Sequence, residues 1–267
     1  MVSFVTFILY SMGVIVNFYR IMNNKFETAK EKILNIDRDR VGIGTLSEKT
    51  LHAILKNYYE PDEDKHEIPI DRFVADIFTG QEILEIQTAQ FNRMREKLDA
   101  FLPLYPVTVI HPISYKKQLF WIDPETGDIS EGRKYTQKAG EYLIFEELYK
   151  IKQYLKDPSL KIKILLLDME EYKLLNGWGE KKKNHASKFD RIPKQIEKEI
   201  LIERKEDYMQ FIPYELEESF TSKDFGKAAH IPQTLATLVL NILDHMEVVE
   251  RIGKEGRAYL YKVREND

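Results

Sequence analysis

Cysteine is absent from this chain of 267 residues. Its absence excludes disulfides, cysteine-ligated zinc and thiol nucleophiles, and it fits a reducing compartment such as the cytoplasm. A global basic field is also missing, because 44 acidic residues outnumber 40 lysines and arginines and leave a formal net charge of −4. Any binding of nucleic acid must therefore come from local patches.

Residues 1–19 lack any charged side chain, and Arg20 is the first charge of the chain. This length matches what is needed to cross a hydrocarbon core of about 30 Å, yet the segment lacks the basic start and small-residue cleavage site of a secretory signal. Two interpretations stay open. Either residues 1–21 anchor the protein in a membrane, or translation starts at Met22; in both cases we expect the body in the cytoplasm.

A hairpin within residues 72–88 carries the most informative pattern of the chain. It reads as two strands joined by a turn at Thr79-Gly80, with Asp76 inside the first strand and Glu85 inside the second. Interior strand positions usually hold apolar or β-branched residues, so these two carboxylates need an explanation. A divalent cation would offset the free-energy cost of gathering them in a partly dry site.

The geometry of this pair depends on the turn. A two-residue loop at Thr79-Gly80 pairs Phe78 with Gln81 and places Asp76, Glu85 and Gln87 on one face. Asp76 and Glu85 are then diagonal neighbours, roughly 7–8 Å apart at Cα, which two side chains and an ion can bridge. A three-residue loop would instead separate them to opposite faces.

The last sixty residues contain a second informative pattern. A helix capped by Ser222, a turn at residues 230–232 and a helix over 233–246 are followed by a β-hairpin over 248–263. This order resembles a winged helix-turn-helix domain. The resemblance implies DNA as the partner, with contacts from the second helix and from the hairpin. The candidate DNA-binding residues are Gln233, Thr234, Thr237, Lys254 and Arg257.

The hairpin and the capped helix before it resemble the PD-(D/E)xK nuclease superfamily. Members of that superfamily place a glutamate on a helix, an aspartate on the first strand and Glu-x-Lys on the second. The matching positions are Glu48, Asp76 and Glu85-Ile86-Gln87, so glutamine replaces the usual lysine. The resemblance spans roughly residues 40–175. Lys97, on the helix that follows, is the candidate substitute for that lysine.

The resemblance implies a magnesium-dependent phosphodiesterase, with Mn²⁺ as a substitute metal. Asp76 and Glu85 would be the metal ligands, Glu48 an outer ligand or water-orienting group, and Gln87 a donor to water or phosphate. Simpler roles stay open for each residue. Glu48 could only close a capping box with Thr45, Asp76 and Glu85 could form structural ion pairs, and Gln87 could be an exposed strand residue.

The expected architecture is an α/β fold, a mixed-sheet nuclease-like sandwich plus a small C-terminal winged-helix domain. We expect the nuclease-like domain over residues 22–178, a basic linker over 179–206 and the winged helix over 207–267. The leading functional hypothesis is a Mg²⁺-dependent DNA endonuclease. The alternative is a catalytically inactive DNA-binding or protein-docking regulator, and the sequence leaves a homodimer open.

Overall fold

The computed structural model describes residues 23–35, 49–176 and 186–264, arranged as two compact units. The first unit comprises the described residues up to Asp64, together with Lys117–Lys134 and Asp168–Ile196; the second comprises Lys65–Lys116, Tyr135–Leu167 and the described residues from Glu197 onward. Glu48 and the N-terminal segment 1–21 lie outside the described residues.

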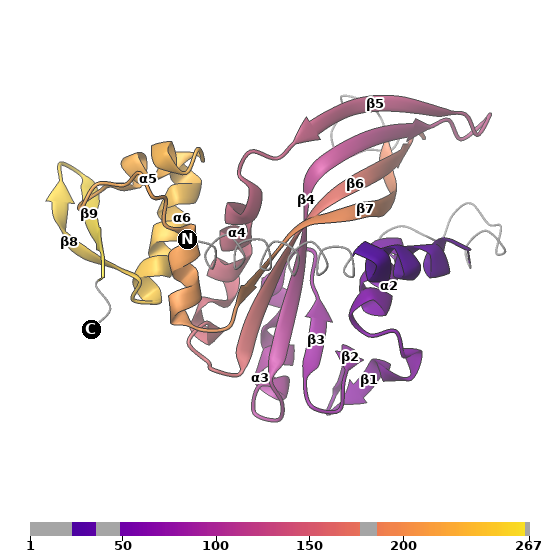
Figure 1. The fold of residues 1–267 in the computed structure, drawn as a ribbon, viewed down its shortest axis with the longest axis horizontal. Coiled ribbons are helices and arrows are strands. Elements are labelled where there is room, and N and C mark those ends of the chain that lie inside the picture. Colours follow the sequence, from indigo (N-terminus) through magenta and orange to yellow (C-terminus); the bar gives the residue numbers. More distant parts are fainter. Residues whose placement is uncertain (1–22, 36–48, 177–185, 265–267) are drawn as a thin grey trace, which may run out of the picture. The chain divides into compact units, whose positions relative to one another are not determined.

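Helices separate groups of two or three strands along the chain (Figure 1). The described α-helices are residues 23–35, α2 (Lys49–Tyr59), α3 (Arg95–Phe101), α4 (Ile144–Leu148), α5 (Ser222–Ala228) and α6 (Gln233–His245). The strands are β1 (His66–Ile70), β2 (Phe73–Phe78), β3 (Ile83–Ile86), β4 (Val107–Ile122), β5 (Ile129–Thr136), β6 (Leu160–Leu174), β7 (Ser187–Ile202), β8 (Val249–Glu255) and β9 (Ala258–Val263). Short 3₁₀ segments are η1 (Glu63–Lys65), η2 (Phe91–Met94), η3 (Gly140–Leu143), η4 (Tyr149–Tyr154) and η5 (Lys205–Phe211).

The main sheet is mixed and confirms the predicted α/β class. Its strand order is β1-β2-β3-β4-β6-β7, and β5 pairs with β4 outside this path. The first three strands form an antiparallel meander, whereas β3 and β4 are parallel, with Ile83 opposite Val107. Parallel neighbours need a crossover connection, and η2 and α3 provide it. Figure 1 shows β3 beside β4 in this arrangement.

Residues 187–202 form strand β7, which differs from the basic linker expected over 179–206. The charged side chains that suggested a linker pair with other elements. Lys198 Nζ lies 2.9 Å from a Glu141 oxygen, Glu197 lies 2.8 Å from Lys116 Nζ, and Lys194 lies 3.4 Å from Glu170. Ion pairs with β6, β4 and η3 thus accompany a strand whose composition is typical of solvated coil.

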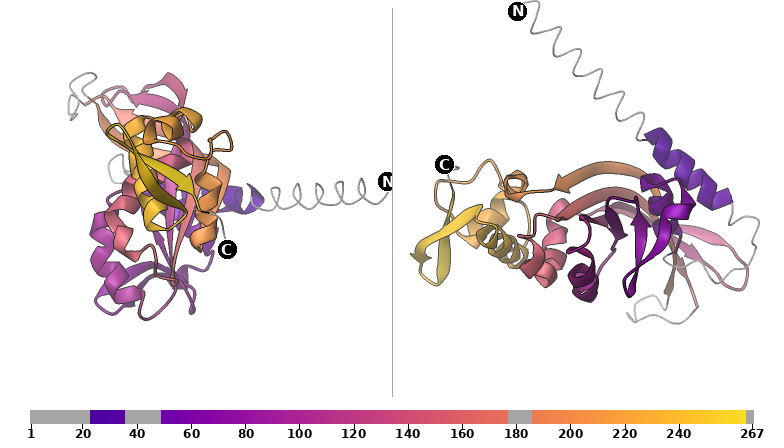
Figure 2. Two further views of the ribbon diagram at one scale, coloured as in Figure 1. Left: turned by 90° about the vertical axis from the view of Figure 1, so that its left-hand side faces the viewer. Right: turned by 90° about the horizontal axis from the view of Figure 1, so that it is seen from below.

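The C-terminal elements follow the predicted order of helix, turn, helix and hairpin. The capping residue differs, because Thr221 rather than Ser222 is the N-cap of α5 and forms a capping box with Asp224. Strands β8 and β9 are antiparallel, with Val249 opposite Val263, and an isolated bridge joins Phe220 to Tyr261. Both views of Figure 2 show this hairpin beside α6.

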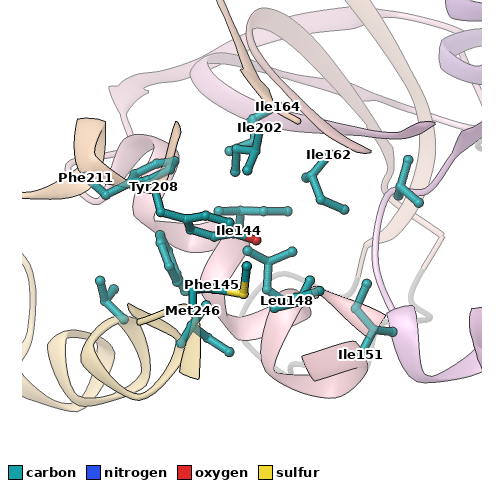
Figure 3. Packing of buried hydrophobic residues seen from close by; sticks show 14 of the residues in the cluster. Ile144, Phe145, Leu148, Ile151, Ile162, Ile164, Ile202, Tyr208, Phe211 and Met246 are labelled. Carbon is teal, nitrogen blue, oxygen red and sulfur yellow. The ribbon is translucent and has the colours of Figure 1, made fainter. Parts of the chain in front are cut away.

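The C-terminal elements share one hydrophobic core with the sheet of the second unit. The sequence instead predicts a separate domain that begins at residue 207. Figure 3 shows Tyr208 and Phe211 of η5 packed near Phe145 of α4, and Met246, which follows α6, close by. The Phe145 and Phe211 rings meet edge to face, 5.0 Å apart at their centroids. Removing the C-terminal segment would therefore expose the apolar face of α4.

No helix among the described ranges is long and apolar enough to cross a membrane. The uncharged segment 1–19 falls outside those ranges, so the expectation of an anchor stays a prediction.

Substitution of Phe145 by alanine should destabilise the second unit and the C-terminal elements together. The side chain is fully buried between the sheet, η5 and the C-terminal helices. We expect the free energy of unfolding to fall by about 3–5 kcal/mol, as for other buried phenylalanines. Urea denaturation followed by circular dichroism measures the change. Y214A is the control, because Tyr214 is 98% exposed and its loss should change stability by no more than about 0.5 kcal/mol.

Candidate functional site

The turn between β2 and β3 has four residues, not the two that the sequence suggested. Phe78 and Ile83 form the last strand pair, so residues 79–82 make the loop. The Thr79 hydroxyl accepts hydrogen bonds from the backbone N–H groups of Gln81 and Glu82, and Gly80 has φ of +93°. Two added loop residues preserve the parity of the pairing. The carboxylates therefore share a face as predicted, but the predicted diagonal placement is wrong.

Asp76 and Glu85 lie opposite each other at the point where β2 and β3 stop pairing. The register set by Ile77 and Leu84 continues to this pair, but the regular backbone ladder does not. Instead, Asp76 N–H donates to Glu85 Oε1 at 3.2 Å, and Ile86 N–H donates to Asp76 Oδ2 at 2.8 Å. Each carboxylate thus satisfies a backbone donor on the other segment where the ladder ends.

Lys97 joins the pair from α3. Its Nζ donates to Glu85 Oε2 at 2.8 Å, and the Glu85 side chain is almost fully buried. The Lys97 side chain is about one quarter exposed, so it contacts both the buried Glu85 carboxylate and the solvent. The structure therefore brings together three of the five residues predicted for catalysis, namely Asp76, Glu85 and Lys97.

Burial raises the pKa of Glu85 to about 7. Loss of hydration is the largest cause, and the negative charge of Asp76 acts in the same direction. Lys97 opposes both effects through its charge and its hydrogen bond, without cancelling them. The site consequently carries more negative charge than its own lysine neutralises, which is the condition under which a bound cation or a proton is stabilised.

The segment between β3 and α3 is held by two residues that the sequence pattern did not identify as site residues. His111 Nδ1 lies 2.6 Å from the Gln87 carbonyl oxygen, and the His111 ring packs edge to face on Phe91. Glu147 accepts a hydrogen bond from Phe91 N–H at 2.9 Å. Burial lowers the pKa of His111, so the imidazole is neutral at pH 7. These contacts position the start of α3 and thereby Lys97.

Gln87 and Glu48 do not join the described cluster. The Gln87 side-chain amide donates to the Ala89 carbonyl, and its backbone N–H donates to Ile110 in β4. Glu48 falls outside the described residues, as does the Thr45 capping box proposed for it. No sequence signal could have found His111 or Glu147, because their partners lie 24 and 56 positions away along the chain.

The donor set fits Mg²⁺ or Mn²⁺ in part. Mg²⁺ commonly binds one or two carboxylates and completes its shell with waters and substrate phosphate. Among the described contacts, Asp76 Oδ1 accepts no hydrogen bond and each oxygen retains lone pairs for a cation. The described residues contain no group of three or more acidic or histidine ligands, so a cation here would rest on two protein carboxylates.

The predicted DNA-binding residues are exposed. Gln233, Thr234 and Thr237 lie on the outer side of the first turns of α6, and the Thr237 hydroxyl donates to the Gln233 carbonyl. Lys254 lies over the Tyr259 ring at 5.1 Å from its centroid, and Arg257 follows at the tip of the β8–β9 hairpin. Neither cation has an ion-pair partner within the described chain.

Stability should fall as pH rises through neutrality because of Glu85. Its folded pKa, about 7, exceeds the ordinary value of 4.5, so the folded state binds the extra proton between these values. The stabilisation is complete below pH 4.5 and is lost as pH rises through 7, at no more than about 1.4 kcal/mol per pH unit. Urea denaturation from pH 5 to 8, compared between wild type and E85Q, isolates this contribution from that of His111. An E96Q variant, on the exposed face of α3, should keep the wild-type slope; a wild-type slope in E85Q would contradict the assignment.

Comparison with known proteins assigns the residues that form the main sheet to a defined family. No solved structure matches the chain. An uncharacterized protein of Treponema pallidum (strain Nichols) is 24% identical over 224 residues, which cover 82% of this chain and 87% of that protein. Residues 49–203, which include Asp76, Glu85, Gln87 and Lys97, match a family described as a domain of unknown function (DUF8091). The chain therefore belongs to the DUF8091 family.

Proposed function

We propose that the chain is a metal-dependent deoxyribonuclease, with Asp76, Glu85 and Lys97 at its active site. One observation carries the proposal: a lysine from α3 reaches Glu85, one of the two carboxylates, at 2.8 Å, although the strand itself has glutamine where a lysine is usual. A compensating lysine beside two opposed carboxylates supports a nuclease-like site of the PD-(D/E)xK type. The cytoplasm, which suits a chain without cysteine, is the proposed compartment.

Asp76 and Glu85 would hold Mg²⁺ or Mn²⁺. When bound, such an ion would supply an activated water and stabilise the charge that builds on the phosphorus centre. Lys97 has three N–H donors, of which one is used by Glu85. The remaining donors can orient the attacking water or bind a non-bridging phosphate oxygen, which places positive charge where negative charge develops.

The C-terminal elements would supply binding to the duplex. Exposed polar side chains at the start of α6 suit base edges, and Lys254 and Arg257 on the hairpin suit phosphates. The isolated bridge between Phe220 and Tyr261 ties the hairpin to the start of α5 and supports a winged-helix arrangement.

Substitution of Asp76 or Lys97 should abolish cleavage without unfolding the chain. D76N keeps an oxygen that can accept from Ile86 N–H, and K97M keeps the length of the lysine side chain. We expect each to lower the rate of plasmid nicking in Mg²⁺ or Mn²⁺ at least about a hundredfold, as for loss of one group that stabilises the transition state.

K198M is the matched control for that experiment. Lys198 forms a comparable pair with Glu141 at 2.9 Å, on β7, and its loss should leave the nicking rate unchanged. Thermal unfolding confirms that each variant is folded. Wild-type activity in both D76N and K97M would overturn the assignment.

A catalytically inactive DNA-binding regulator is the second candidate. It is favoured by Gln87, which lacks a positive charge and whose amide donates to Ala89 rather than to the carboxylates. It is also compatible with the exposed cations of the β8–β9 hairpin. This candidate predicts binding of DNA with no cleavage in either metal.

Removal of Lys254 or Arg257 should weaken DNA binding under both candidates. Each contact with phosphate releases counterions, so K254Q and R257Q should each reduce the slope of log affinity against log salt concentration by about 0.9. Fluorescence anisotropy with a labelled duplex at several salt concentrations measures the slope, with K198Q as control. An unchanged slope in both variants would show that the hairpin does not contact DNA.

A further inference from the structure

Strand β5 is an exposed sheet edge. Of its eight residues only Gly132 is even partly covered, and among the described strands β5 pairs with β4 alone. A strand edge presents unpaired N–H and C=O groups that can template pairing with another strand. Natural proteins usually block such edges, and β5 contains no proline that would do so.

The hydrogen bonds of the β4–β5 hairpin identify which backbone groups face outward. The carbonyl of Asp128 accepts from Asp123 N–H, and that of Gly132 accepts from the Gln118 side chain, so even-numbered residues over this part of the hairpin face β4. Nearer the end of the strand the alternation shifts by one residue, because the Gln137 N–H donates to the Tyr115 carbonyl of β4. The N–H and C=O of one residue point to the same side, and the side alternates along a strand. Ile129, Glu131 and Arg133 therefore present their backbone groups to the free edge.

We propose that this edge pairs with β5 of a second copy of the chain, antiparallel and centred on Gly132. A two-fold axis at Gly132 places Glu131 of each copy opposite Arg133 of the other, as hydrogen-bonded pairs with opposite charges. Centring the axis on Glu131 or on Arg133 would place like charges directly opposite each other, which is destabilising. The order of charges therefore favours the two-fold symmetric contact whose axis passes through Gly132.

Gly132 suits the position on the axis. In this register it forms a non-hydrogen-bonded pair with itself, where opposite Cα atoms approach to about 4.5 Å. A Cβ added to Gly132 would lie 2.8 Å from Trp121 Nε1 and 3.1 Å from the Leu119 carbonyl oxygen. Trp121 thus covers one face of the strand at this glycine and would flank the axis in both copies.

The charges on β5 also explain why its edge would pair with an identical strand and not with other strands. An exposed ion pair between Glu131 and Lys134, 3.7 Å apart, leaves both side chains largely solvated within one copy. Charged edges discourage pairing with arbitrary strands, while a self-complementary charge order permits pairing with an identical one. An edge this short buries less area than a permanent dimer, so we expect a reversible dimer with Kd on the order of micromolar.

Charge reversal on the full-length chain tests the proposal, which is independent of the proposed function. Sedimentation equilibrium should show a dimer at about 100 µM protein in low salt, weakened as salt is added. R133E and E131R should each raise Kd at least about tenfold, because two pairs of like charges then face each other. The double variant E131R/R133E should restore the wild-type Kd, since it exchanges the charges within the same register.

Mixing the two single variants gives the sharpest result. E131R carries only positive charges at these positions and R133E only negative ones, so the mixture should form heterodimers although each variant alone is monomeric. K134E is the matched control, because it reverses one charge at a position that faces Ser130. A monomeric wild type, or a dimer unaffected by R133E, would overturn the proposal.

Discussion

The reciprocal bonding of Asp76 and Glu85 is the constraint on which the site depends. Strand β3 leaves β2 after Leu84 and continues as the parallel neighbour of β4, so the ladder between β2 and β3 has to end. Where it ends, backbone donors lose their strand partners and would be unsatisfied in a buried position. The two carboxylates accept hydrogen bonds from Asp76 N–H and Ile86 N–H and so allow the sheet to change from antiparallel to parallel.

This structural role has an electrostatic consequence. Two acidic side chains are held together where Glu85 is almost fully buried, and Lys97 neutralises only part of their charge. The folded protein therefore retains an affinity for one more positive charge, which a proton supplies near neutral pH. A divalent cation meets the same need and adds chemistry that a proton lacks. The structural role of the pair is thus compatible with the proposed metal site.

The sequence predicted element types better than their connections. Alternation and turn residues located β2, β3, the β4–β5 hairpin and the C-terminal helices, because these signals are local. The four-residue turn could not be read from Thr79-Gly80 alone, since the Thr79 hydroxyl closes it by bonding two later N–H groups. Strand β7 could not be predicted from its charged composition, because its charged residues pair with residues that are distant along the chain. Lys97 follows from the family resemblance, in which a lysine on the next helix can replace the one missing from the strand, whereas His111 and Glu147 act over separations that leave no pattern.

Both β7 and β5 are rich in charged residues, and the two strands differ in whether those charges find opposite partners within the chain. In β7, Lys194, Glu197 and Lys198 each find an opposite partner within the chain, and the strand ends the sheet order next to β6. In β5 the charges at Glu131 and Arg133 flank a glycine on an edge, and no described strand supplies complementary charges in register. The same rule of cross-strand pairing is therefore satisfied internally in one strand and left open in the other. A second copy of the chain satisfies it with the residues already present, because an antiparallel two-fold contact reverses the order of the two charges.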